Sequence, residues 1–126
     1  VVLEGELVRT ELVGAGGEVA SVVGPLLEAL ALDRQPHQDL MVMYQGWMDC
    51  LTAAEAARIT GRFRLATDPN DAAAKRDALR TCHQLEQEAA RLRNQAAKER
   101  QIARQAELNV ALQSLRVQLA EARARL

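Results

Sequence analysis

The sequence predicts a mainly α-helical chain with a short β-hairpin at its N-terminus, and three observations indicate this fold class. Residues 70–126 contain no glycine or proline, so nothing in that stretch interrupts a helix. Apolar residues in the last third recur at alternating four- and three-residue spacings, which is the heptad pattern of helices that pack along one side. Only 2% of the residues are aromatic, and a core of Leu, Val and Ala suits closely packed helices.

The N-terminal stretch 1–13, VVLEGELVRTELV, predicts the β-hairpin. Gly5 divides it into two short runs in which apolar residues alternate with polar ones, as on a strand with one buried side. The following stretch Gly14–Gly17 predicts a flexible turn. It does not fit a phosphate-binding loop, because no Gly-Lys-Ser/Thr follows it.

Two helices are expected next, packed against each other. The first is expected over residues 25–32, because Pro25 suits the first position of a helix, and residues 33–36 form a connector. The second is expected to begin at Pro36 and to end at Gly61. Its apolar stripe, which includes two of the three aromatic residues and is expected to anchor the core, is Leu40, Tyr44, Trp47, Leu51, Ala54 and Arg58.

The last helical region is expected to begin at Asp68-Pro69, since Asp caps helix N-termini and Pro fits the first helical position. Two heptad seams follow, and the second is out of register with the first by two residues. One seam is Ala78, Cys82, Leu85, Ala89, Leu92 and Ala96; the other is Leu108, Leu112, Leu115, Leu119, Ala122 and Leu126.

The offset between the seams falls within residues 97–104, and it favours an antiparallel helical hairpin or coiled coil that turns there. The alternative is one continuous helix that presents two sides to two partners. Such a helix would extend about 87 Å at 1.5 Å per residue.

The organisation along the chain predicts two regions. Residues 1–66 form a small strand-plus-helix region, which we expect to be the C-terminal piece of a larger α/β domain because the chain begins without Met, inside a predicted strand. Residues 67–126 form the coiled-coil-like region. Charge is divided unevenly: residues 1–74 hold five basic and eleven acidic side chains, whereas residues 75–126 hold eleven basic and six acidic ones.

The basic C-terminal part supplies the candidate interaction surface: Arg91, Arg93, Lys98, Arg100, Arg104 and Asn109. The simplest interpretation of these charges is the solvated side of a coiled coil, with Glu88, Glu99 and Glu107 as partners. The alternative is a ridge that binds phosphate groups of a nucleic acid.

Catalysis, a cofactor and a small-molecule substrate are not expected. Cys82 and His83 are adjacent, so their side chains diverge by about 100° on a helix and do not converge on one metal ion. His37, the second histidine, is remote in sequence, and no third group orients a Cys-His nucleophile pair. No metal site is expected either.

A cytoplasmic location is expected. Two isolated cysteines, Cys50 and Cys82, do not make a disulfide framework. No apolar run approaches the roughly 20 residues of a membrane span, and no signal peptide is visible.

Three stretches resemble a bacterial family of domains of unknown function. Residues 44–51 (YQGWMDCL) and 56–63 (AARITGRF) resemble a helix and its exit segment, and residues 98–109 (KERQIARQAELN) resemble the closing signature of the family. The matches to that signature are Glu99, Gln101, Arg104, Glu107, Leu108 and Asn109. The departures are Arg100, Ile102, Ala103, Gln105 and Ala106, and Ala103 replaces an Asn suited to cap the last helix.

The resemblance covers about residues 40–126 and implies partners rather than an activity. The resemblance implies a gene of the kind often encoded beside Swi/Snf-type helicases and adenine-specific DNA methyltransferases in phage-defence, restriction-like loci. Together with the heptad seams, this predicts an interaction or oligomerisation module that docks on a second copy of itself or on a helicase or methyltransferase. The alternative is a nucleic-acid-binding accessory domain that uses Arg62, Arg64 and the basic run.

Overall fold

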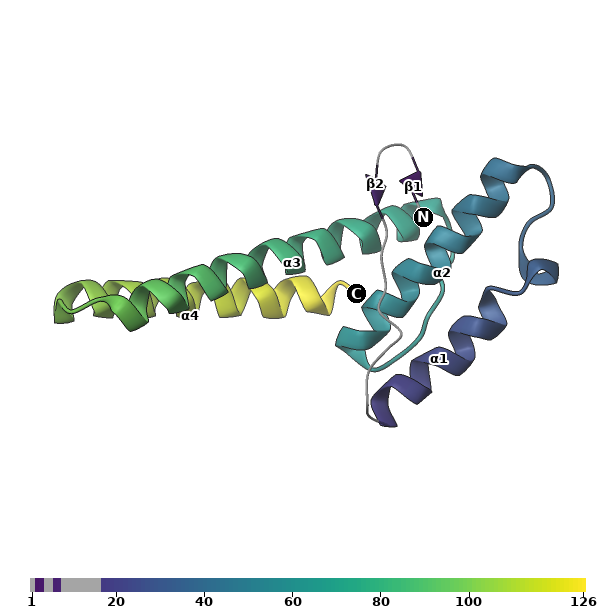
Figure 1. The fold of residues 1–126 in the computed structure, drawn as a ribbon. Helices are drawn as coiled ribbons and strands as arrows, with labels where there is room; N and C mark the ends of the chain where they lie inside the picture. Colours follow the sequence, from purple (N-terminus) through teal and green to yellow (C-terminus); the bar gives the residue numbers. More distant parts are fainter. Residues whose placement is uncertain (1, 4–5, 8–16) are drawn as a thin grey trace. The chain divides into compact units, whose positions relative to one another are not determined.

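The fold was analysed in a computed structural model, which describes residues 2–3, 6–7 and 17–126. Within them the chain is mainly helical, with four α-helices: α1 (Gly17–Ala29), α2 (Leu40–Thr60), α3 (Pro69–Lys98) and α4 (Ile102–Ala124) (Figure 1). A 3-10 helix, η1 (Leu32–Arg34), lies between α1 and α2. The chain divides into two compact units, Val1–Arg76 and Asp77–Leu126. The division falls inside α3, whereas the sequence pattern places its boundary between residues 66 and 67.

At the N-terminus, β1 (Val2–Leu3) pairs antiparallel with β2 (Glu6–Leu7), with Val2 opposite Leu7 and Leu3 opposite Glu6. The residues that would join and extend these strands, 4–5 and 8–13, lie outside the described part of the chain, and so do residues 14–16 of the expected turn. The complete hairpin and the turn therefore stay predictions.

The first helix is longer and earlier than expected. It begins at Gly17 and ends at Ala29, so Pro25 lies inside it rather than at its first position. Proline has a fixed φ that suits a helix, and its cost inside one comes from its missing N–H and from its ring. The apolar side also differs, because Leu26 is fully buried but Leu27 is 59% exposed.

The second helix begins at Leu40 rather than at Pro36. Its N-cap is Asp39, whose Oδ1 accepts a hydrogen bond from the Val42 N–H at 2.8 Å, an arrangement that satisfies one of the open donors of the first turn. The expected end at Gly61 is confirmed: Gly61 has φ 75°, a left-handed conformation that glycine adopts without strain, and its N–H donates to the Ala57 carbonyl.

In the core of unit Val1–Arg76, α2 contributes small side chains rather than the large residues of the expected stripe. Of that stripe only Ala54 is fully buried, whereas Leu40 and Tyr44 are 69% and 43% exposed. Small residues at the contact let α1 and α2 approach closely, which places the bulky side chains at the edge of the contact. The residues that form this core are Val22, Leu26, Cys50, Ala54 and Ala57.

The third helix begins where the sequence predicts. Asp68 accepts hydrogen bonds from the N–H groups of Asn70 and Asp71 at 2.8 and 2.9 Å, and Pro69 is the first helical residue. Asp71 in turn accepts from the Thr67 N–H at 2.9 Å and pairs with Arg64 at 3.0 Å. These contacts lower the pKa of the Asp71 carboxyl; the hydrogen bond from the Thr67 N–H is the larger cause, and the hydrogen bond from Arg64 is the second.

In unit Asp77–Leu126 the chain turns back on itself. Helix α3 ends at Lys98 and α4 begins at Ile102, so the break lies within the predicted segment 97–104, and one continuous helix is excluded. Figure 1 shows the two helices side by side. The antiparallel direction is marked by an ion pair between Glu86 and Arg123, 37 residues apart in sequence and 2.9 Å apart in space.

Both predicted seams face the inside of this helical hairpin. From α3, Ala78, Cys82, Ala89 and Ala96 are buried, and Leu85 and Leu92 are partly buried. From α4, Leu112 and Ala122 are buried, and Leu108, Leu115 and Leu119 are partly buried, as is Leu126 just after the helix. The two-residue offset between the seams is absorbed by the three residues that separate the helices.

Candidate functional site

The turn of the helical hairpin is organised by Glu99. Its Oε1 accepts hydrogen bonds from the backbone N–H groups of Arg100 and Gln101, at 2.8 and 2.9 Å. Gln101 is the N-cap position of α4 but makes no cap hydrogen bond with its own side chain. The carboxylate of Glu99 therefore orders the turn just before α4, because both of its N–H donors precede the first helical residue, Ile102. Ala103 is the second residue of α4 and not its N-cap.

The six residues of the candidate interaction surface are all exposed, but Arg91 and Arg93 point to sides of α3 about 160° apart at 100° per residue. Arg91 and Lys98 lie one heptad apart on the outer side of α3, about 10.5 Å apart along the helix axis. Arg91 pairs with Glu88 at 3.7 Å, and Arg104 pairs with Glu99 at 3.7 Å. The role of this surface stays a prediction.

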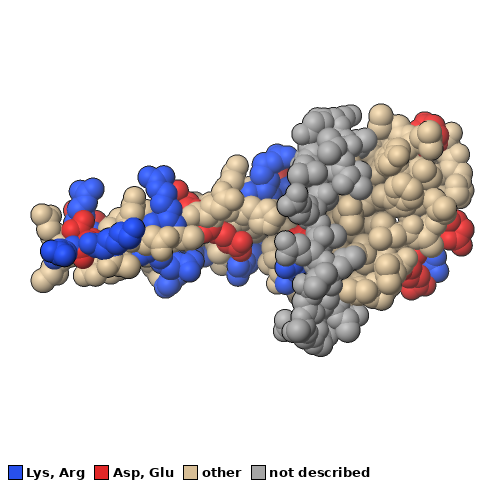
Figure 2. Space-filling model, in the orientation of Figure 1, with Lys and Arg blue, Asp and Glu red and all other residues tan. Residues whose placement is uncertain are grey.

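Figure 2 shows how charge is distributed along the helical hairpin. On the visible side, Lys and Arg side chains are separated by acidic and uncharged residues rather than joined into a continuous basic strip. The outer side of α3 also carries a shallow hollow, and its lining is polar apart from one alanine: Gln87, Ala90, Arg91, Asn94, Gln95 and Lys98.

The outer side of α4 differs from that of α3, and the sequence reasoning did not identify it. Ile102, Val110 and Val117 are 84%, 70% and 51% exposed. They belong to a helix whose opposite side already packs in the helical hairpin. The sequence does contain a pattern that indicates this side. When the heptad spacing of the first seam, Ala78–Ala96, is extended toward the C-terminus, it meets Ala103, Ala106 and Val110.

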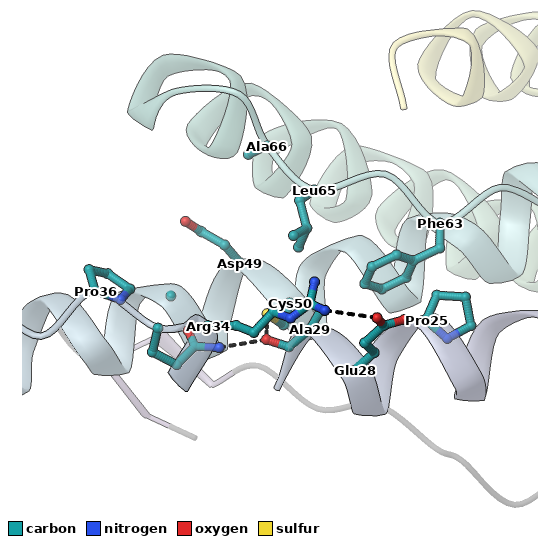
Figure 3. Close-up of a pocket in the computed structure, with 12 residues that line it drawn as sticks. Pro25, Glu28, Ala29, Arg34, Pro36, Asp49, Cys50, Phe63, Leu65 and Ala66 are labelled. Carbon is teal, nitrogen blue, oxygen red and sulfur yellow. Dashed lines mark hydrogen bonds and ion pairs between the residues drawn. The ribbon is translucent and has the colours of Figure 1, made fainter. Parts of the chain in front are cut away.

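A second hollow, of about 400 Å³, lies within unit Val1–Arg76 between α1, α2 and the loop after α2 (Figure 3). Gln35 is buried beside it, and its Nε2 donates to the Ala29 carbonyl at 2.6 Å. A Cβ atom at position 46 would overlap the Gln35 side chain, so Gly46 is what allows this approach. The Cys50 thiol donates to the same Ala29 carbonyl at 3.5 Å.

The ionisable groups around this hollow are held by internal contacts. Burial raises the pKa of the Cys50 thiol, which keeps it protonated and weakly nucleophilic at neutral pH. Burial also raises the pKa of Asp49, opposed by its ion pair with Arg76 at 3.0 Å. Lys75 is 2% exposed and donates to the Arg64 carbonyl at 2.6 Å; burial lowers its pKa. Lys75 thereby fixes the loop between α2 and α3, and the Asp49–Arg76 ion pair joins α2 to α3.

Two features are absent from the part of the chain that the structure describes, namely a metal-binding cluster and a membrane-spanning helix. No group of three or more His, Cys, Asp or Glu side chains is placed to hold a metal ion. No helix combines the length and the apolarity needed to cross a membrane.

Residues 2–119 match the family described as "Domain of unknown function (DUF4391)". The chain belongs to this family. The match extends over nearly the whole chain, beyond the stretch of about residues 40–126 that carries the resemblance, and the expected membership of a family of unknown function is confirmed. No curated protein matches the chain, and no solved structure matches it.

Proposed function

We propose that this chain is a protein–protein interaction module and that unit Asp77–Leu126 carries its docking surface. The observation that supports this most strongly is the exposed apolar side of α4, where Val110 and Val117 are 70% and 51% exposed. A helix in a two-helix hairpin needs only one apolar side for its own packing. A second apolar side in contact with water is typical of a surface that a partner covers.

The partners expected from the family resemblance are a second copy of this chain or a helicase or methyltransferase of a phage-defence system. We propose that the protein is cytoplasmic, where the free thiols of Cys50 and Cys82 stay reduced. In this function the chain binds a partner protein; it catalyses no reaction and holds no cofactor.

Site-specific photo-crosslinking in cells tests this function. A photoreactive amino acid replaces Val110 on the outer side of α4, and in a matched control it replaces Asn94 on the outer side of α3; both positions are exposed. We expect a discrete protein adduct from position 110 and none from position 94. Absence of any adduct from position 110 would contradict the proposal.

A nucleic-acid-binding function is the second candidate, and the observation that favours it is the pair Arg91 and Lys98 beside the polar hollow of α3. Fluorescence anisotropy with duplex and single-stranded DNA across a salt series tests it. Two neutralised phosphates would give a logarithmic salt slope of about −2, which the double substitution Arg91→Ala and Lys98→Ala would remove. No binding at low salt would eliminate this function.

A further inference from the structure

The exposed apolar side of α4 is a complete heptad seam of its own. Its residues recur at alternating three- and four-residue spacings, and every one of them is exposed: Ala103, Ala106, Val110, Gln113, Val117, Ala120 and Ala124. At 100° per residue the centre of this outer seam lies about 165° from the centre of the Leu108–Leu126 seam. The outer seam is therefore on the opposite side of the helix and cannot take part in the packing against α3.

We infer that the outer seam of α4 is the contact surface for a second copy of this chain, in which the two α4 helices run parallel about a two-fold axis. The inference rests on the proposed function and names its partner. An isologous contact of this kind uses one self-complementary surface twice. The outer seam contains no charged residue, so it can be covered without burying a charge.

The charges beside the outer seam favour a copy of the same chain in the parallel direction. One flank is acidic or neutral: Glu107, Ser114 and Glu121. The other flank holds Ile102, Asn109, Arg116 and Arg123. In a parallel pair each flank faces the opposite flank of the partner, which places Arg116 of one copy next to Glu121 of the other. Within the described residues these two side chains have no ion pair of their own.

An antiparallel pair would bring each flank against itself. Glu107 of one copy would then face Glu121 of the other, and the two flanks that carry Arg116 would also meet. Like charges placed opposite one another are unfavourable and act against the wrong arrangement. The parallel direction is therefore the one that the charges of this chain support.

The residues within the outer seam agree with a two-stranded parallel contact. Val110 and Val117 occupy the heptad position at which β-branched residues favour two strands. Gln113 occupies the alternate position, where it meets Gln113 of the second copy and the two amides can donate to and accept from each other. The remaining layers are alanine, which allows close approach but buries little apolar area. We therefore expect a reversible dimer that dissociates on dilution.

Sedimentation equilibrium of the whole chain over a concentration series tests the dimer. We expect a monomer–dimer equilibrium, and the double substitution Val110→Glu and Val117→Glu should raise its dissociation constant at least about tenfold. The matched control places the same two charges on the outer side of α3, as Gln87→Glu and Asn94→Glu, and should leave the constant unchanged. Circular dichroism verifies that all variants keep their helix content.

Disulfide trapping tests the direction of the helices. Val110→Cys should cross-link to itself in a parallel dimer, because equivalent residues at this position face each other within disulfide range. In the antiparallel pair that places Glu107 opposite Glu121, the two copies of residue 110 would lie about 12 Å apart along the axis. The native thiols, Cys50 and Cys82, are buried. A charge exchange tests the parallel direction independently. Arg116→Glu alone or Glu121→Arg alone should weaken the dimer, and the two changes together should restore it.

Three results would overturn the inference. A chain that stays monomeric at every concentration has no such contact, and a dimer that tolerates glutamate at positions 110 and 117 uses another surface. A dimer that fails to cross-link at position 110 is not parallel. A monomer whose position 110 still cross-links to a different protein in cells would reject the dimer but support the proposed function, so the two failures are distinguishable.

Discussion

The two sides of α4 carry apolar residues at the same spacing but have opposite exposures. Leu112 on the inner side is 7% exposed, whereas Val110 on the outer side is 70% exposed. Within α4 the inner seam, which packs against α3, contains four leucines: Leu108, Leu112, Leu115 and Leu119. The outer seam is mostly alanine and valine. The side of α4 with the larger apolar area is thus the one that packs against α3. The weaker side is left for a contact that can form and dissociate.

The largest expected effect separates these two sides. Leu112→Ala should lower the free energy of unfolding by about 2–4 kcal/mol, because it removes buried methyl groups and leaves a cavity. Val110→Ala should change it by no more than about 0.5 kcal/mol, because the side chain is exposed and alanine favours the helix. Urea unfolding at a concentration where the chain is monomeric measures both. Equal losses would show that the outer side of α4 is packed within the chain.

A smaller effect is expected at the turn that sets which side of α4 faces inward. Glu99→Ala should cost about 1 kcal/mol, because two backbone N–H groups of the turn lose their acceptor. Arg100→Ala, at an exposed neighbour whose side chain makes no ion pair within the described residues, serves as the control and should be nearly neutral. The same unfolding measurements apply. A neutral Glu99→Ala would mean that water replaces the carboxylate without loss.

The smallest effect is expected on the outer side of α3. The ion pair between Arg91 and Glu88 joins two largely exposed side chains at 3.7 Å, and such pairs contribute little because water and salt screen them. Arg91→Ala should therefore leave the free energy of unfolding and the dimer dissociation constant unchanged within error. A clear loss of dimer in this variant would move the contact surface from α4 to α3.

The sequence allowed the regular part of the fold to be predicted well. Asp68-Pro69 located the start of α3, Gly61 located the end of α2, and the offset of the two seams located the turn between α3 and α4. These features are local, or they repeat along one helix, so a single sequence displays them. The start of α1 was missed, because Pro25 suits a helix interior and a helix start almost equally in its backbone angle.

The packing between helices was harder to predict. From the sequence, Tyr44 and Trp47 were expected to anchor the core through α2. The residues of α2 that pack against α1 are instead Cys50, Ala54 and Ala57. Tyr44 instead packs edge-on against Trp47 with ring centres 5.6 Å apart, and the Trp47 Nε1 donates to the Leu30 carbonyl. Which stripe of a helix is buried depends on the surface that faces it, and that surface comes from a distant part of the chain.

The candidate site shows the same limit. All six residues of the predicted basic surface are exposed, as charged residues on a helical hairpin usually are, so exposure alone does not distinguish a binding surface from a solvated one. The outer seam of α4 was visible in the sequence as a continuation of the first seam through Ala103, Ala106 and Val110. Its meaning depended on the turn at residues 99–101, which directs it away from α3, so that within unit Asp77–Leu126 it stays exposed.

The most direct test of the contact surface is side-chain NMR of the labelled chain followed through a dilution series. We expect the methyl signals of Val110 and Val117 to shift or broaden with concentration, while the side-chain amide signals of Gln87 and Asn94, on the outer side of α3, stay constant. Changes at Gln87 and Asn94 with constant Val110 and Val117 signals, or no change at any of the four, would contradict it.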